Sequence, residues 1–176
     1  MSPHRAASLV RACSLVYVLA AVACSNDTSS GPFAPASAAL SAARVALPFS
    51  GTVVSGHTAV YPPGTNTALI HEVGTGSATH LGRYTWVEDI TLDLATLTGT
   101  AQATLTAANG DVVTATVVVS GAPAGGVFID TEEVATITGG TGRFAHAKGS
   151  YTLKRSLNVA TGASTGSFDG TITYWN

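Results

Sequence analysis

From Pro48 onward, apolar and polar residues alternate with a period of two, which is typical of β-strands that bury one face. The pattern is clearest from Arg83 to Leu94. Its more apolar face carries Tyr84, Trp86, Glu88, Ile90, Leu92 and Leu94. The alternate positions carry mainly threonine and aspartate, so we predict a strand with one face toward a core and one toward water.

Similar segments follow one another at short spacing, separated by turn residues. Asn109-Gly110, between the segments 101–107 and 112–119, is a strong β-hairpin signal. We expect about eight strands, at 48–60, 67–80, 83–94, 101–107, 112–119, 127–138, 151–157 and 168–174. This pattern predicts an all-β fold, a single closed or nearly closed antiparallel barrel over residues 48–176. Gly56 is expected to mark a bulge or bend in the first strand.

The orientation of the strand faces separates two kinds of barrel. Outer-membrane barrels are apolar outside and polar inside. In this sequence the apolar face of each strand is expected to point inward, and the Thr/Asp/Lys face outward to solvent. A barrel of about eight strands has an interior just wide enough to be filled by side chains or to hold one small ligand. We therefore predict a soluble barrel.

The first residues have the pattern of a secretory signal peptide, which we assign to residues 1–23. Basic residues precede an apolar stretch from Ala12 to Ala23, which is shorter than the roughly 20 residues that span a bilayer. Residues 21–24, Ala-Val-Ala-Cys, resemble a bacterial lipobox, which implies lipidation of Cys24. Residues 24–47, rich in Ser, Ala and Pro, are expected to form a flexible tether.

Two locations follow from this leader. If Cys24 carries a lipid, Ser25 beside it implies anchoring at the outer membrane, with the lipid as the only membrane contact. If the chain is instead cut near Ala23 and Cys24 is incidental, the protein is periplasmic or extracellular. Either way we predict an exported protein.

Composition excludes several classes of partner. Charged residues make up 10% of the chain, its net charge is −2, and no basic stripe is present, so we expect no nucleic-acid partner. Both cysteines, Cys13 and Cys24, lie in the leader region, so the barrel is expected to have neither a disulfide nor a cysteine-ligated zinc. The histidines lack metal-ligand spacing, and we expect no metal and no other cofactor.

A glycine-rich segment precedes the strand at 151–157. Gly139, Gly140 and Gly142 permit backbone angles that are closed to other residues, so we predict a compact turn or a single helical turn at a barrel corner. Phe144 is expected to plug one end of the barrel, and Arg143 to cap carbonyl groups there. The segment lacks the Lys-Ser/Thr pair of a phosphate-binding loop.

The same residues carry a family resemblance. Gly-Gly-Thr-Gly-Arg-Phe at 139–144, followed by Ala147 and Gly149, resembles a segment of dirigent proteins and the allene-oxide-cyclase barrel superfamily. Residues 76–84 look like a companion motif in bacterial secreted proteins with a related barrel, and residues 168–172 also fit the resemblance. The resemblance implies an allene-oxide-cyclase-like barrel of bacterial secreted lipoprotein type, for which a homo-oligomer is one option.

Two charged residues fall on predicted inward faces. Glu88 shares its face with Tyr84 and Trp86, and Arg155 shares its face with Tyr151. One hypothesis joins them as a polar spot in an apolar cavity, lined by the three aromatic side chains, that holds a small, partly apolar ligand. The other interpretation, which we favour, places Glu88 near a barrel mouth, where it reaches water.

The other acidic residues give weaker signals. Asp130, Glu132 and Glu133 are interpreted as a solvated patch at the rim of the barrel. His71 and Glu72 are neighbours and are expected to face opposite sides of their strand. No nucleophile elbow is present, so a hydrolase triad is not supported.

Three functions stay open. The first is a non-catalytic envelope barrel that binds a small hydrophobic ligand or a protein partner. The second is a structural envelope module with a filled core. The third, which rests on the resemblance, is an isomerase, cyclase or dirigent-type enzyme, for which we assign no catalytic residue. Cavity volume separates the binding protein and the enzyme from the structural module, because a ligand site needs on the order of several hundred Å³.

Overall fold

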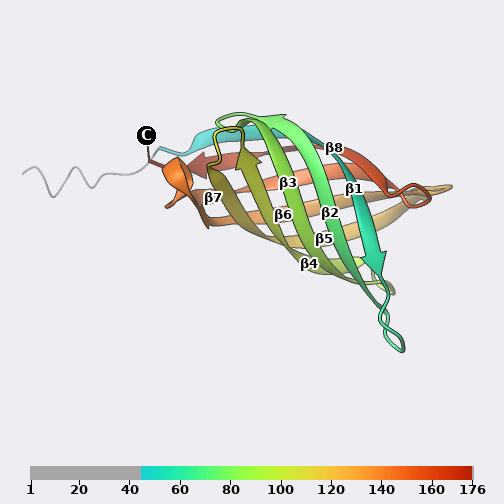
Figure 1. Ribbon diagram of the computed structural model, residues 1–176. Helices are drawn as coiled ribbons and strands as arrows, with labels where there is room; N and C mark the ends of the chain where they lie inside the picture. The colour runs from blue at the N-terminus through green and yellow to red at the C-terminus, as the bar shows by residue number, and fades with distance from the viewer. Residues whose placement is uncertain (1–44, 176) are drawn as a thin grey trace, which may run out of the picture. The chain divides into compact units, whose positions relative to one another are not determined.

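The computed structural model describes residues 45–175, which form an all-β domain (Figure 1). Eight strands follow one another along the chain, with one 3₁₀ turn, η2, between the sixth and seventh. Their bounds are β1 Leu47–Val60, β2 Thr67–Ala78, β3 Gly82–Asp93, β4 Thr98–Ala107, β5 Val112–Gly125, β6 Phe128–Gly140, η2 Gly142–Phe144, β7 Lys148–Asn158 and β8 Ala163–Thr173. The predicted signal peptide 1–23, Cys24 and nearly all of the tether 24–47 lie outside the described residues.

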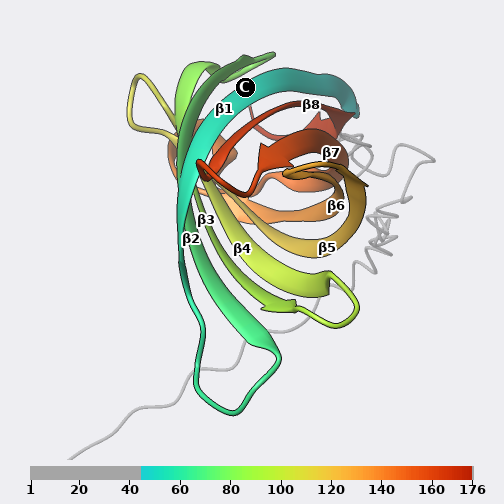
Figure 2. The ribbon, with the colours of Figure 1, turned by 90° about the vertical axis from the view of Figure 1, so that its right-hand side faces the viewer.

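The eight strands form a closed barrel in which each strand pairs antiparallel with its neighbours in sequence. The ring closes through β1 and β8, which run side by side in Figure 2 and pair from Leu47↔Ile172 to Gly56↔Ala163. A closed ring leaves no unpaired edge strand. The predicted fold class is confirmed. Within residues 45–175, no helix is long and apolar enough to cross a membrane.

The apolar faces of the strands point into the barrel and form one core. Trp86 on β3, Leu105 on β4 and Val117 on β5 are almost wholly buried, and the neighbouring threonines face outward. Burying a large apolar side chain stabilises the fold by about 1.5–3 kcal/mol. The period-two pattern therefore correctly predicted which face is buried.

The irregularities of the sheet lie elsewhere than expected. The pairing of β1 with β2 and β8 runs without a register shift through Gly56, so no bulge occurs there. The register shifts are between β5 and β6, at Thr114/Ala115 and at Pro123/Gly125. β5 also continues beyond its predicted end at residue 119 as far as Gly125, because its backbone still finds partners on β6.

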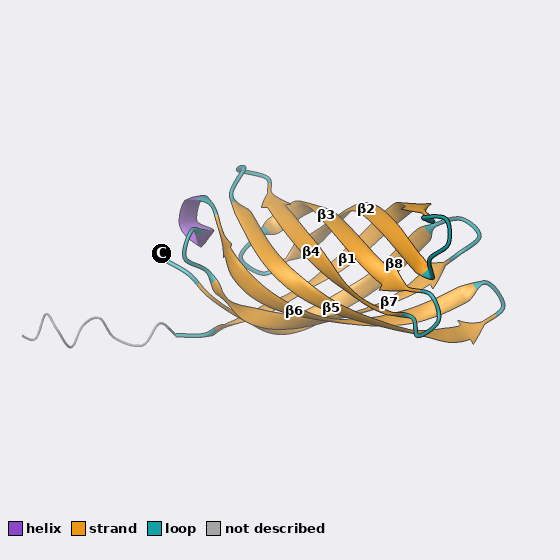
Figure 3. Ribbon diagram, turned by 90° about the horizontal axis from the view of Figure 1, so that it is seen from below, coloured by secondary structure: helices purple, strands orange, loops and turns teal. Residues whose placement is uncertain are grey.

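One end of the barrel is closed by the glycine-rich segment, seen as the helical turn in Figure 3. Phe144 and Ala147 are fully buried there, and the ring centroids of Phe144 and Tyr174 lie 5.0 Å apart. Arg143 donates a hydrogen bond to the His80 carbonyl, which ties η2 to the β2–β3 turn. At Gly140 a Cβ would lie 1.8 Å from the Val112 carbonyl oxygen, so the close approach of β5 requires glycine.

The opposite end, which we call the mouth, is formed by the β1–β2, β3–β4, β5–β6 and β7–β8 hairpins (Figure 3). Leu97 in the β3–β4 turn has a left-handed φ of 53°, and its carbonyl accepts a 2.8 Å hydrogen bond from the Gly121 N–H. This bond holds the turn against β5. Exposed apolar side chains occupy these hairpins: Val60, Tyr61, Leu94, Val127, Phe128 and Val159.

Candidate functional site

Four charged side chains from four strands meet inside the barrel. Glu72 on β2, Glu88 on β3 and Glu133 on β6 are 1–2% exposed, and Arg155 on β7 is also buried. We call this set the Glu–Arg cluster. Buried charges are stable only when they are paired and hydrogen-bonded, so the geometry of these contacts decides what the site can do.

Arg155 is the centre of the cluster. Its Nε donates a 2.7 Å hydrogen bond to Glu133 Oε1, and its Nη2 contacts the same oxygen. Nη1 pairs with Glu72 Oε1, and Nη2 lies 3.4 Å from Glu88 Oε2. The guanidinium also stacks on Trp86, 4.9 Å from the ring centroid. One guanidinium therefore bridges three carboxyl groups, and the barrel closure brings them to it.

Two serines complete the polar network on the β1–β8 side. Ser55 Oγ donates a 2.6 Å hydrogen bond to Glu72 Oε1, and Ser164 Oγ donates to the same oxygen at 3.1 Å. Ser55 and Ser164 are opposite each other in the β1–β8 register, just as Glu72 and Glu88 are opposite each other between β2 and β3. Glu88 Oε1, in contrast, is buried without a hydrogen-bond partner among the described residues.

Burial and mutual repulsion shift the proton affinities of the cluster. Burial raises the pKa of Glu88 well above its usual 4.5, and the charges of Glu133 and Glu72 raise it further against the pull of Arg155. Burial also raises the pKa of Glu133, although Arg155 counteracts part of this effect. Glu88 therefore keeps its proton to a higher pH than an ordinary glutamate does.

A small cavity leads from the mouth to the cluster. Its volume is about 50 Å³, which is room for a few water molecules or one small polar group. Glu72, Arg155, Thr131 and His57 supply its polar lining. Its apolar walls are formed by Ile70, Ile90, Leu92, Leu97, Val119, Ile129 and Leu157. The cavity therefore joins an apolar entrance to a charged floor.

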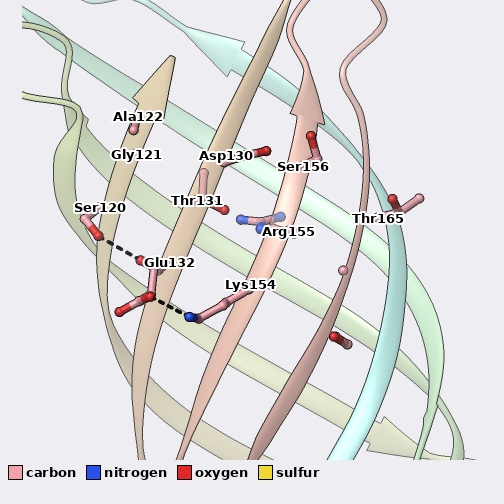
Figure 4. A pocket seen from close by; sticks show the side chains of 12 residues that line it. Ser120, Gly121, Ala122, Asp130, Thr131, Glu132, Lys154, Arg155, Ser156 and Thr165 are labelled. Atoms are coloured by element: carbon pink, nitrogen blue, oxygen red, sulfur yellow. Dashed lines mark hydrogen bonds and ion pairs between the residues drawn. The ribbon is translucent and has the colours of Figure 1, made fainter. Parts of the chain in front are cut away.

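A much larger depression, of about 770 Å³, lies on the outer wall over β5–β8 and is open to solvent (Figure 4). Two of its charged groups, Lys154 and Glu132, are paired with each other, since Lys154 Nζ lies 3.2 Å from Glu132 Oε2. Ser120 donates a hydrogen bond to the Glu132 carbonyl beside them. Because the Glu–Arg cluster points the other way, we place the candidate site in the mouth cavity, despite its smaller volume.

The structure places the five predicted ligand-binding residues at two levels of the interior. Arg155 lines the mouth cavity, and Glu88 and Trp86 lie just behind it, in contact with the guanidinium. Tyr84 and Tyr151 lie toward the closed end, where Tyr84 donates to the Thr52 carbonyl and burial raises its pKa to about 12. The pairing of Glu88 with Arg155 is present, and a ligand-binding role for the five stays a prediction.

Two interpretations from the sequence are wrong. Glu88 does not reach water at a mouth, because it is only 1% exposed and lies in the middle of the strand pairs of β3. Glu133 is not part of a solvated patch with Asp130 and Glu132. It is 1% exposed and bound to Arg155, whereas the other two are exposed.

Glu72 and Glu133 were missed as site residues, although the alternation carried a signal for both. Glu133 has the same parity as Ala135 and Ile137, which are buried in β6. Glu72 has the same parity as Ala68, the buried residue near the start of β2. The signal was overlooked because glutamate is rarely buried without a partner, and the partner comes from a distant strand.

Comparison with known proteins supports the class of fold. No family model matches the chain, and no curated protein matches it. The domain is a dirigent-like eight-stranded barrel in its fold. A solved structure similar to it is that of the pterocarpan synthase dirigent protein GePTS1, with a TM-score of 0.52 over 74% of this chain and 90% of that chain. The sequence identity is 12%, so the similarity concerns the fold alone.

Proposed function

We propose that the protein is an exported, lipid-anchored envelope barrel that binds one end of a small, largely apolar molecule in its mouth, without catalysis. The observation that carries this proposal is the mouth cavity, where apolar walls lead to a buried charged floor. Binding sites for small molecules are typically apolar with a few convergent polar groups. The polar end enters first, toward Glu72 and Arg155, and the apolar remainder stays between the walls.

The size of the cavity limits what enters. Complete drug-sized ligands need about 300–1,000 Å³, and the cavity offers about 50 Å³. Only a head group of a few atoms is therefore held inside. The exposed apolar residues of the hairpins, such as Tyr61 and Phe128, extend the apolar surface outward for the rest of the molecule.

Export and anchoring rest on the leader sequence. Cys24 after Ala-Val-Ala supports lipidation, and the residues up to 47 supply a tether. β1 begins at the closed end, since Leu47 pairs with Ile172 beside the end of β8. The tether is therefore attached at the closed end, and the mouth lies at the opposite end of the barrel. Labelled palmitate should enter the native protein in bacteria and should not enter Cys24→Ser.

A structural envelope module is the second candidate, because the interior beyond the mouth is filled by side chains. An enzyme of the cyclase or dirigent type is the third. GePTS1 is described as a pterocarpan synthase, and Glu88 has the raised pKa of a proton donor. Glu88 does not line the cavity, however, so Glu72 is the carboxyl group that a substrate would meet.

The test of the proposed function compares two tryptophan variants. Leu157→Trp fills the mouth cavity, and Val118→Trp adds the same side chain to the outer wall, where Val118 is 61% exposed. Small molecules that co-purify with each full-length protein are identified by untargeted mass spectrometry, after circular dichroism has shown that each variant is folded. We expect a ligand with the native protein and Val118→Trp that is lost in Leu157→Trp.

The same experiment identifies the alternatives. A ligand retained equally by all three proteins would contradict binding in the mouth. The absence of any co-purified or added ligand from the native protein would favour the structural module.

A further inference from the structure

The acidic and basic side chains inside the barrel are unequal in number. The Glu–Arg cluster has three carboxyl groups around one guanidinium. The other described Lys and Arg side chains, Arg83, Arg143, Lys148 and Lys154, are all exposed. Within residues 45–175 the interior therefore holds more carboxyl groups than cationic side chains, and the raised pKa of Glu88 limits the negative charge that results.

Arg155 is not free to bind an anionic ligand. Its Nε is used by Glu133, its Nη1 by Glu72 and Ser164, and its Nη2 by Glu133 and Glu88. A carboxylate or phosphate entering the cavity would meet an occupied guanidinium. It would also meet Glu72, which lines the cavity and would repel a negative group. The floor is therefore selective against anions.

The unused capacity of the cluster is for donors. Glu72 is the carboxyl group that the cavity reaches, and both serine hydroxyls and Arg155 converge on a single one of its oxygens, Oε1. An alkylammonium brings a positive charge and three N–H donors in a head group small enough for about 50 Å³.

We propose that the mouth cavity takes a protonated primary amine on a short apolar chain, with the ammonium against Glu72 and the chain between Ile70, Leu97 and Leu157. This inference rests on the proposed function, since it names the class of ligand for the same cavity. The ammonium places its N–H donors against Glu72, the carboxyl group that the cavity reaches. The apolar walls bury the first methylene groups, each of which contributes about 0.8 kcal/mol.

The test uses three compounds that share a six-carbon chain and differ in the head group: n-hexylamine, 1-hexanol and hexanoate. Isothermal titration of each into the full-length protein at neutral pH measures the dissociation constants. We expect hexylamine to bind at least about tenfold more tightly than hexanol, and hexanoate to bind most weakly. Glu72→Gln should remove the preference for hexylamine over hexanol.

Glu132→Gln is the matched control, because Glu132 is exposed on the outer wall and should affect none of the three compounds. If hexanol or hexanoate binds the native protein as tightly as hexylamine, the amine inference is overturned and binding in the mouth stands. If none of the three binds, both proposals fail. An amine preference that persists in folded Glu72→Gln would also overturn the inference.

Discussion

Arg155→Met is the sharpest test of the buried cluster. The substitution keeps a long unbranched side chain and removes the cation that bridges three carboxyl groups. The carboxyl groups then remain inside the barrel, where the Ser55 and Ser164 hydroxyls still donate to Glu72 and the Thr131 hydroxyl to Glu133. Glu88 and Glu133 lose the opposite charge that favoured their ionised forms, so their pKa values in the folded state rise further.

The magnitude follows from burial. The Arg155 side chain is 4% exposed, so solvent screens its ion pairs little. Removing one partner of a buried ion pair costs about 3–5 kcal/mol. For a domain of this size, such a loss lowers the melting temperature by about 10–20 °C. The matched control is Lys154→Met on the same strand, where the side chain is 72% exposed. This substitution should lower the free energy of unfolding by no more than about 1 kcal/mol.

The assay is urea unfolding followed by circular dichroism at neutral and at mildly acidic pH. A carboxyl group whose pKa is raised in the folded state stabilises the fold below its unfolded pKa and loses this contribution as the pH rises through the folded pKa. The loss in Arg155→Met should therefore be smaller in acid. Adding Glu133→Gln should restore part of the stability at neutral pH.

If Arg155→Met unfolds at the same urea concentration as the native protein at neutral pH, Arg155 does not stabilise the buried carboxyl groups. If the loss is instead independent of pH, the cost comes from packing and not from the uncompensated carboxylates.

Three further predictions concern stability. The stability of the native protein should decline as the pH rises from about 4.5 through the raised pKa of Glu88, and Glu88→Gln should flatten this decline. Thermal melts across pH measure the effect. An unchanged decline in Glu88→Gln would contradict the proposal that buried Glu88 keeps its proton. Gly140→Ala should cost about 1–3 kcal/mol in urea unfolding because its Cβ meets the Val112 carbonyl, whereas Gly56→Ala, with open space around it, should be neutral or stabilising; equal effects would refute the close approach. Phe144→Ala should cost about 3–5 kcal/mol by the same measurement, and a smaller cost would show that the closed end does not depend on this ring.

The amino-acid pattern was enough to predict the kind of sheet and the direction of its faces. Period-two alternation requires only local geometry, because successive side chains of a strand point to opposite sides. It correctly predicted that Trp86, Glu88 and Arg155 face inward. The glycines at 139–142 predicted a compact turn or a single helical turn, and Phe144 is buried there. These features depend on neighbours within a few residues.

For Glu133, proximity along the chain predicts the wrong environment. Glu133 was grouped with Asp130 and Glu132 by proximity along the chain, yet its parity with Ala135 and Ile137 is what buries it. A glutamate on an inward face is stable only with a partner, and the sequence does not say that the partner exists.

The site is assembled only by the tertiary structure. Glu72, Glu88, Glu133 and Arg155 lie on four strands, and the closed ring with its register brings them together. Pairing at one register and closure at one circumference are collective properties of all eight strands, which no local pattern encodes. The volume left at the mouth is likewise the small difference between the space inside the ring and the side chains that fill it, so only the packed barrel fixes it.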